Sequence, residues 1–204
     1  NNYGTYPGIQ VQNEGGVSAD VTLTYTPAAG ASGTACSETK TLAAGQSDTF
    51  FLGAVGGFAG AGTNDCIANE QFWVGGAAVT TNTGGVDLIA IVNQTNFTED
   101  GASSNSHNPN NATTTVLFPL IMDQNYGFFT GFNVLSLADN NDITCTFTGE
   151  PTYDINITLN TNDVLNNVQL NYLPAGYVGS AICSGTGNMV GVANQARTGS
   201  NNGD

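Results

Sequence analysis

The stretch DVTLTY at Asp20–Tyr25 recurs as DITCTF at Asp142–Phe147, and these two segments together decide the fold class. In each segment, apolar or cysteine side chains alternate with threonine, so that one face is apolar and the other hydroxylated. This two-residue period is typical of a strand that buries one face in an antiparallel sheet. A hydrophobic content of 40% with such patterning favours packed strands over disorder. We therefore predict an all-β protein.

Three further pairs of segments accompany this one, in the same order in both halves of the chain. They are Asn2–Val11 with Asn125–Val134, Val74–Ala77 with Val178–Ala181, and Ile91–Gln94 with Val192–Gln195. Because chance rarely preserves four ordered blocks, we interpret them as an internal duplication. Short predicted strands separated by turn signals are typical of sandwiches. We therefore predict two tandem Ig-like antiparallel β-sandwich modules, in each of which the first two strands form a hairpin.

The module boundaries follow from local composition. Residues 96–113 are rich in Asn, Ser and Thr and nearly lack aliphatic side chains, which predicts a polar linker or surface loop. The first β-sandwich module then spans residues 1–95 and the second spans residues 114–197. A polar tail follows at residues 198–204.

The charge balance excludes several classes of partner. The 204 residues include two basic and sixteen acidic side chains, for a formal net charge of -14. Nucleic-acid binding and attachment to anionic lipid both need clustered Lys and Arg, so we expect neither. No apolar run approaches the ~18 residues that would predict membrane insertion. The chain begins at Asn1 without a leader, and we expect that a leader is cleaved and that the protein is secreted, extracellular or on the cell surface.

The four cysteines predict two disulfides in an oxidising compartment. Alignment of the two halves places Cys145 on Leu23 and Cys183 on Val79, so two apolar positions become two cysteines. We therefore predict a Cys145–Cys183 bond inside module 2, and we expect Leu23 and Val79 to be neighbours in module 1. The other two cysteines, Cys36 and Cys66, are predicted to pair within module 1.

Catalytic chemistry has little support, and we expect no enzyme, no catalytic residues and no cofactor. His107 lies in the polar linker, where nothing apolar would hold the rigid geometry that a Ser-His-acid triad needs. The acidic residues are dispersed through turns rather than paired as in glycosidases. One histidine and no CxxC pair give no zinc site. A structural calcium ion at Asp139–Asp142 with Asn162 and Asp163 stays open, although neither segment matches an EF-hand loop.

Two kinds of surface residue suggest interactions with sugar. Exposed aromatic side chains could stack on a bound glycan, and the candidates are Trp73, Tyr126, Phe128 and Phe129. Covalent glycosylation is predicted at four sequons, those of Asn93, Asn96, Asn111 and Asn156. The sequons at Asn96 and Asn111 flank the polar linker, where we expect the best exposure.

Several phrases of the sequence are similar to modules found in tandem in large secreted bacterial surface proteins. They are Gly8–Asn13, Val21–Tyr25, Ile89–Gln94, and Leu117–Met122 followed by Asn125-Tyr126-Gly127. The likeness covers both modules, but its motifs are structural. It implies a β-sandwich surface protein and no chemistry. Module 2 departs from the pattern by placing Cys145 and Cys183 in its strands.

One asymmetry between the modules suggests a function. Module 2 is preceded by an apolar strand with an edge-type proline, Pro119, and module 1 has no counterpart. A sandwich that lacks a strand exposes an apolar groove and unpaired backbone groups, so a neighbour's strand can complete it. The predicted assembly strand consists of Val116, Leu117, Phe118, Leu120 and Ile121, supplied by a neighbour's Thr114–Met122 rather than by its tail from Arg197.

The resulting prediction is a secreted structural subunit that polymerises head to tail with copies of itself into an extracellular filament or surface layer. Its partners would be further copies of the same chain and covalently attached glycans. The alternative is a monomeric cell-surface adhesin or carbohydrate-binding module. A viral coat protein built from sandwiches also stays open.

Overall fold

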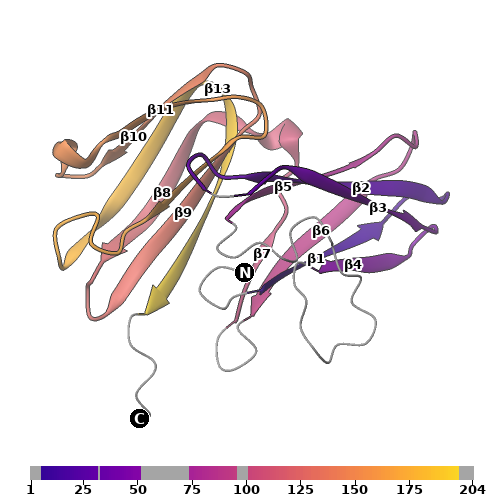
Figure 1. The fold of residues 1–204 in the computed structure, drawn as a ribbon, viewed down its shortest axis with the longest axis horizontal. Coiled ribbons are helices and arrows are strands. Elements are labelled where there is room, and N and C mark those ends of the chain that lie inside the picture. Colours follow the sequence, from indigo (N-terminus) through magenta and orange to yellow (C-terminus); the bar gives the residue numbers. More distant parts are fainter. Residues whose placement is uncertain (1–5, 32, 52–73, 96–100, 198–204) are drawn as a thin grey trace, which may run out of the picture. The chain divides into compact units, whose positions relative to one another are not determined.

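The computed structural model describes residues 6–31, 33–51, 74–95 and 101–197 (Figure 1). The chain divides into two compact units, unit 1 at Asn1–Ser106 and unit 2 at His107–Asp204. Within the described residues the regular structure is antiparallel strand, apart from two 3-10 turns, η1 (Pro109–Asn111) and η2 (Pro151–Tyr153). The all-β prediction is therefore confirmed.

Unit 1 is a sandwich of two sheets. One sheet has the strand order β4-β1-β6-β7 and the other has the order β3-β2-β5. The strands are β1 (Tyr6–Asn13), β2 (Ala19–Pro27), β3 (Cys36–Leu42), β4 (Ser47–Phe51), β5 (Gly75–Thr81), β6 (Leu88–Thr95) and β7 (Gly101–Asn105).

The core of unit 1 lies between these sheets and follows the alternation seen in the sequence. In β2, Val21, Leu23 and Tyr25 are fully buried. They share one cluster with apolar side chains of the facing sheet, among them Val11 and Phe50. The threonines between them lie on the outer face, where hydroxyls bond across strands, as in Thr22 with Thr39 at 2.8 Å and Thr24 with Ser37 at 3.0 Å. We refer to these outward cross-strand pairs as hydroxyl ladders.

The predicted hairpin between the first two strands is wrong. β1 pairs with β4 and β6, whereas β2 pairs with β3 and β5, so the turn carries the chain from one sheet to the other. Buried Asn13 holds this crossing. Its side-chain amide donates to the carbonyl oxygens of Val17 and Leu42, and its Oδ1 accepts from the Gly15 N–H.

Unit 2 has the strand path β11-β10-β13-β9-β12, and β8 also pairs with β13. Its strands are β8 (Thr113–Asp123), β9 (Phe128–Ser136), β10 (Asn141–Phe147), β11 (Ile155–Leu159), β12 (Val164–Val168) and β13 (Tyr177–Arg197). The register of β13 shifts between Ser184 and Met189. Before the shift β13 pairs with β10 and β8. After it β13 pairs with β9 and, at Met189, with Thr113 of β8, so the hairpin predicted for β9 and β10 is also wrong.

The range predicted as a polar linker, residues 96–113, contains structure of its own. β7 pairs with β6 over Gly101–Asn105 and extends the sheet of unit 1, and η1 follows. The boundary between the units falls after Ser106, inside the predicted range. In the part of the chain that the structure describes, no helix has the length and apolar character to cross a membrane.

The strand registers of the two units agree at the positions that the sequence alignment matched. Leu23 pairs with Val79 between β2 and β5, which confirms that these two residues are neighbours. Cys145 pairs with Cys183 between β10 and β13. The two pairs therefore serve as a common reference for comparing the units.

Candidate assembly surface

β8, the predicted assembly strand, is seated in its own unit. It pairs with β13 from Tyr177 to Ser184, and among the described residues it has no strand on its other edge. Phe118 and Ile121 are buried in the core of unit 2. The Phe118 ring lies 4.7 Å from that of Phe132, centroid to centroid. β8 is thus an edge strand that contributes to the core.

The apolar residues of β8 divide between its two faces. Val116, Phe118 and Ile121 pack on the core of unit 2, whereas Leu117 is 65% exposed and Leu120 is 41% exposed. Ile182 of β13, which pairs with Leu117, is exposed as well, and so is Val178. We call these four exposed side chains, Leu117, Leu120, Val178 and Ile182, the outer apolar stripe. Of these, Val178 and Ile182 were not predicted, although their spacing in Tyr177–Cys183 signals a strand with apolar residues on both faces.

The strand of unit 1 that corresponds to the first half of β13 is β5. Among the described strands β5 pairs only with β2. In unit 2, Ala181 and Cys183 are fully buried beside β8. The matching residues of β5, Ala77 and Val79, are only partly buried. The core of unit 1 is therefore less covered at the place where β8 covers unit 2.

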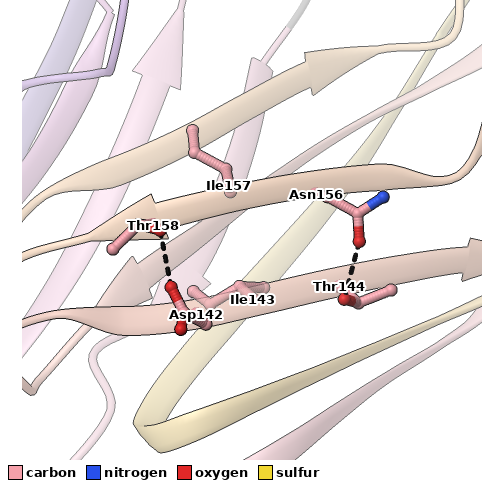
Figure 2. A pocket seen from close by; sticks show the side chains of 6 residues that line it. All are labelled: Asp142, Ile143, Thr144, Asn156, Ile157 and Thr158. Carbon is pink, nitrogen blue, oxygen red and sulfur yellow. Dashed lines mark hydrogen bonds between the residues drawn. The ribbon is translucent and has the colours of Figure 1, made fainter.

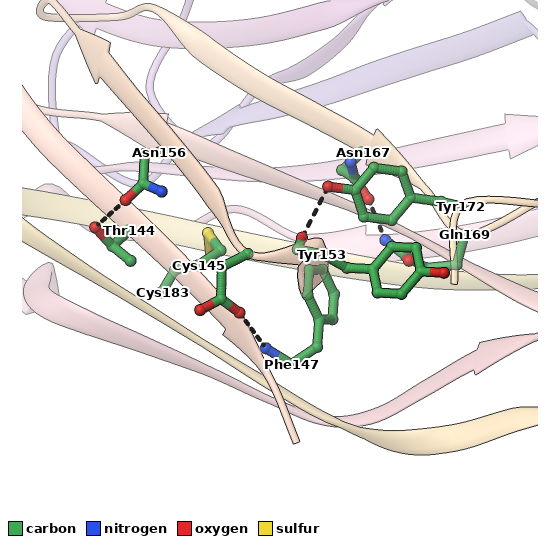
Figure 3. Close-up of a disulfide and its surroundings, with 10 residues drawn as sticks. Thr144, Cys145, Phe147, Tyr153, Asn156, Asn167, Gln169, Tyr172 and Cys183 are labelled. Carbon is green, nitrogen blue, oxygen red and sulfur yellow. Dashed lines mark hydrogen bonds between the residues drawn. A yellow bond between two sulfur atoms is a disulfide. The ribbon is translucent and has the colours of Figure 1, made fainter. Parts of the chain in front are cut away.

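The predicted disulfide of unit 2 is present. Cys145 and Cys183 form a bond between directly paired residues of β10 and β13, with their Cα atoms 3.9 Å apart (Figure 3). Both cysteines are buried. Cys36 is also disulfide-bonded, and Cys66 lies outside the described residues, so the pairing of these two stays a prediction.

The acidic residues considered for calcium cap turns and strands. Asp139 accepts from the Thr161 N–H at 3.0 Å, and this bond lowers the pKa of Asp139 below its usual value. Asp163 accepts from the Asn160 N–H at 2.8 Å, and Asp142 accepts from the Thr158 hydroxyl at 2.6 Å (Figure 2). The described residues contain no group of three or more His, Cys, Asp or Glu side chains that could hold a metal ion.

The predicted glycosylation sites fall in different surroundings. Asn93 on β6, Asn111 in η1 and Asn156 on β11 are exposed, and Asn96 lies outside the described residues. The Asn156 Oδ1 accepts from the Thr144 hydroxyl at 2.8 Å, as Figure 2 shows. These side chains can therefore be reached from solvent.

Three of the aromatic residues considered for sugar binding are described, and two of these are exposed. Tyr126 is 90% exposed in the turn between β8 and β9, and Phe128 is exposed beneath the Arg197 guanidinium, 5.7 Å from the ring centroid. Phe129 is half-buried, and Trp73 lies outside the described residues. His107, the one candidate base, is exposed at the start of unit 2.

Comparisons with known proteins give no match: no family model, no curated protein and no solved structure is similar to the chain.

Proposed function

We propose that the chain is a secreted, non-enzymatic structural subunit that polymerises head to tail into an extracellular filament or surface layer. The observation that carries this proposal is the edge of β5 that has no neighbouring strand within the described ranges, with Ala77 and Val79 only partly buried. An open edge offers a row of backbone N–H and C=O groups to another chain. A strand added there would also cover the partly buried apolar residues.

The composition of the edge supports this proposal. Natural edge strands are usually protected against pairing by charged residues, proline or bulges. Gly75–Thr81 contains no charged residue and no proline. In contrast, β3, at the other edge of the same sheet, carries Glu38 and Lys40. The two edges of one sheet thus differ in protection, and β5 is the unprotected one.

Three further features belong to the proposal. We interpret the matched registers of Leu23 with Val79 and Cys145 with Cys183 as the result of an internal duplication. The disulfide is compatible with an oxidising extracellular compartment. Glycans at the exposed sequons would hydrate a chain in which charged residues are only 9%.

The test uses lysines on β5. Ala78→Lys/Thr80→Lys places two charges on the outer face of this strand, and the matched control is Ser37→Lys/Thr39→Lys on β3. The control lies on the opposite edge in the same rows, because Thr24 pairs with Ser37 and Ala78, and Thr22 pairs with Thr39 and Thr80.

We expect wild type and control to form filaments in negative-stain micrographs, and the β5 variant to remain monomeric in analytical ultracentrifugation. A wild-type chain that stays a 20.9 kDa monomer at all concentrations would refute the proposal.

The alternative function, a monomeric adhesin or carbohydrate-binding module, has one observation in its favour. Tyr126 is 90% exposed, and its backbone φ is positive, at 49°. A large side chain in this conformation is uncommon, and such positions cluster at functional sites. Binding of glycans by a monomer, lost in Tyr126→Ala, would favour this alternative.

A further inference from the structure

We infer that the surface which meets β5 is the outer apolar stripe and free edge of β8 from a second copy, with β8 remaining in its own unit. This inference rests on the proposed function, because it names the partner surface for the β5 edge. It differs from strand swapping, in which β8 would leave unit 2 and enter unit 1 of a neighbour.

The packing around Gly191 argues against swapping. A Cβ at this glycine would lie 2.6 Å from Val116 Cγ1 and 2.7 Å from Phe118 Cζ, which is closer than real Cβ contacts. Unit 1 has Ala90 at the equivalent position of β6. A β8 strand inserted into unit 1 as it sits in unit 2 would therefore collide with the Ala90 methyl group.

The core of unit 2 gives a second argument against swapping. Phe118 and Ile121 are buried, and the Phe118 ring packs on Phe132. Removal of β8 would expose both side chains and leave a cavity in the core. A contact that uses the opposite face of β8 avoids this cost and leaves unit 2 intact.

The pattern of β8 is that of a strand covered on both faces. In this run of apolar residues, Val116, Phe118 and Ile121 pack on the core of unit 2. Leu117 and Leu120 lie on the opposite, solvent-exposed face of the strand. Strands with near-continuous apolar runs are typically buried on both sides. Clustered exposed apolar side chains mark interaction sites, and the outer apolar stripe extends from β8 onto β13.

Neither of the two edges carries a charged side chain where the pairing would form. Thr113–Met122 of β8 and Gly75–Thr81 of β5 contain no charged residue in a chain whose net charge is -14. The side chains of these two strands therefore add no charge repulsion when two copies approach through them. Pro119 lacks an N–H, so we place the backbone pairing on Thr113–Phe118.

The proposed contact joins two different surfaces, so it can propagate from one copy to the next. The β5 edge belongs to unit 1 and the β8 edge to unit 2, so each chain carries one of each. A contact between two different surfaces is heterologous, and it generates an open chain of subunits when its rotation does not close a ring. Every added copy therefore presents a fresh edge for the next.

The test is Leu117→Asp/Leu120→Asp in the full chain, with Val17→Asp/Ile89→Asp as the matched control. The control residues are 53% and 56% exposed and lie in unit 1, outside β5. We expect the critical concentration for assembly to rise about a hundredfold or more in the first variant, because each contact would lose two leucines that it buries in the wild type and would gain two carboxylates. It should stay near the wild-type value in the control. Both variants should keep the wild-type circular dichroism spectrum, because all four side chains are exposed in the single chain.

Hydrogen–deuterium exchange provides the second readout. On assembly of the wild type, amides of Ala77–Thr80 and Val116–Phe118 should gain protection together. Protection gained on β3, β4, β11 or β12 instead would overturn the inference, and so would normal assembly of the Leu117→Asp/Leu120→Asp variant. In both of those results the wild type still polymerises, so the proposed function stands and the assignment of β8 fails. A wild type that never assembles refutes both.

Discussion

Removal of the Cys145–Cys183 bond should destabilise unit 2 and leave unit 1 unaffected. The two cysteines are separated by 38 positions in the sequence. In the chain-entropy model, a closed loop of about this length stabilises the fold by about 4 kcal/mol, because the cross-link restricts the unfolded chain. The variant Cys145→Ala/Cys183→Ala removes the cross-link and two buried sulfur atoms.

The expected change in melting temperature follows from the size of the unit. His107–Asp204 contains about 100 residues, for which the entropy of unfolding is about 0.2 kcal/mol/K. A loss of 4 kcal/mol then lowers the midpoint by about 20 °C. Unit 1 has its own core and should keep its transition.

The assay is differential scanning calorimetry of the wild type and the variant, with peptide mapping to verify that Cys36 remains bonded. Leu23→Ala is the reciprocal control, because it truncates the residue that the alignment matches with Cys145 and should lower only the unit 1 transition. A shift of the unit 2 transition below about 5 °C would refute the reasoning, since it would mean that the cross-link hardly restricts the unfolded chain.

Three further predictions concern unit 2. Gly191→Ala should cost about 1–3 kcal/mol by overpacking against Val116 and Phe118, measured by urea unfolding. Gly131→Ala is the control and should cost much less, because a Cβ there would lie 3.7 Å from Val168; unchanged stability of Gly191→Ala would show that β8 shifts without cost. Asp123→Ala removes the buried acceptor for the N–H groups of Asn171, Tyr172 and Leu173. The variant should lower the free energy of unfolding by about 2–4 kcal/mol and speed amide exchange in that loop, and unchanged exchange would contradict this role. Burial, and secondarily the charge of Asp154, raises the pKa of Tyr172, so the folded state holds the phenol proton more tightly than the unfolded state. The resulting stability is present below pH ~10 and is lost as pH rises beyond it. In an absorbance titration, the Tyr172→Phe variant should lack this late-ionising phenol.

The sequence predicts the strands whose pattern is unambiguous. In Asp20–Tyr25 and Asp142–Phe147 every second side chain is apolar, so the buried face and the phase of each strand follow directly. The disulfide could be predicted because the alignment placed Cys145 and Cys183 on two apolar positions. Those positions prove to be paired across strands in both units.

Other features depend on tertiary pairing and could not be predicted from local pattern. Turn residues after Asn13 indicate a chain reversal, but they do not distinguish a hairpin from a crossing between sheets. β7 has the sequence GASSN, with no apolar alternation, and it becomes a strand by pairing with β6. In β8 the apolar run has no polar face, so the sequence pattern does not show which side chains enter the core. The register shift opposite Gly179 and Ala181 places Phe118 and Ile121, three positions apart, on the same buried face of the strand.

The hydroxyl ladders link neighbouring strands on the outer faces of the sheets through side chains that carry no charge. Thr22 with Thr39, Thr24 with Ser37 and Thr148 with Ser180 are neutral pairs, and salt does not screen them as it screens ion pairs between exposed charges. Their protonation also stays constant across the pH range in which carboxylates and histidines titrate. High salt or mild acid should therefore leave these hydroxyl pairs as they are, and only the charged side chains should respond to the medium.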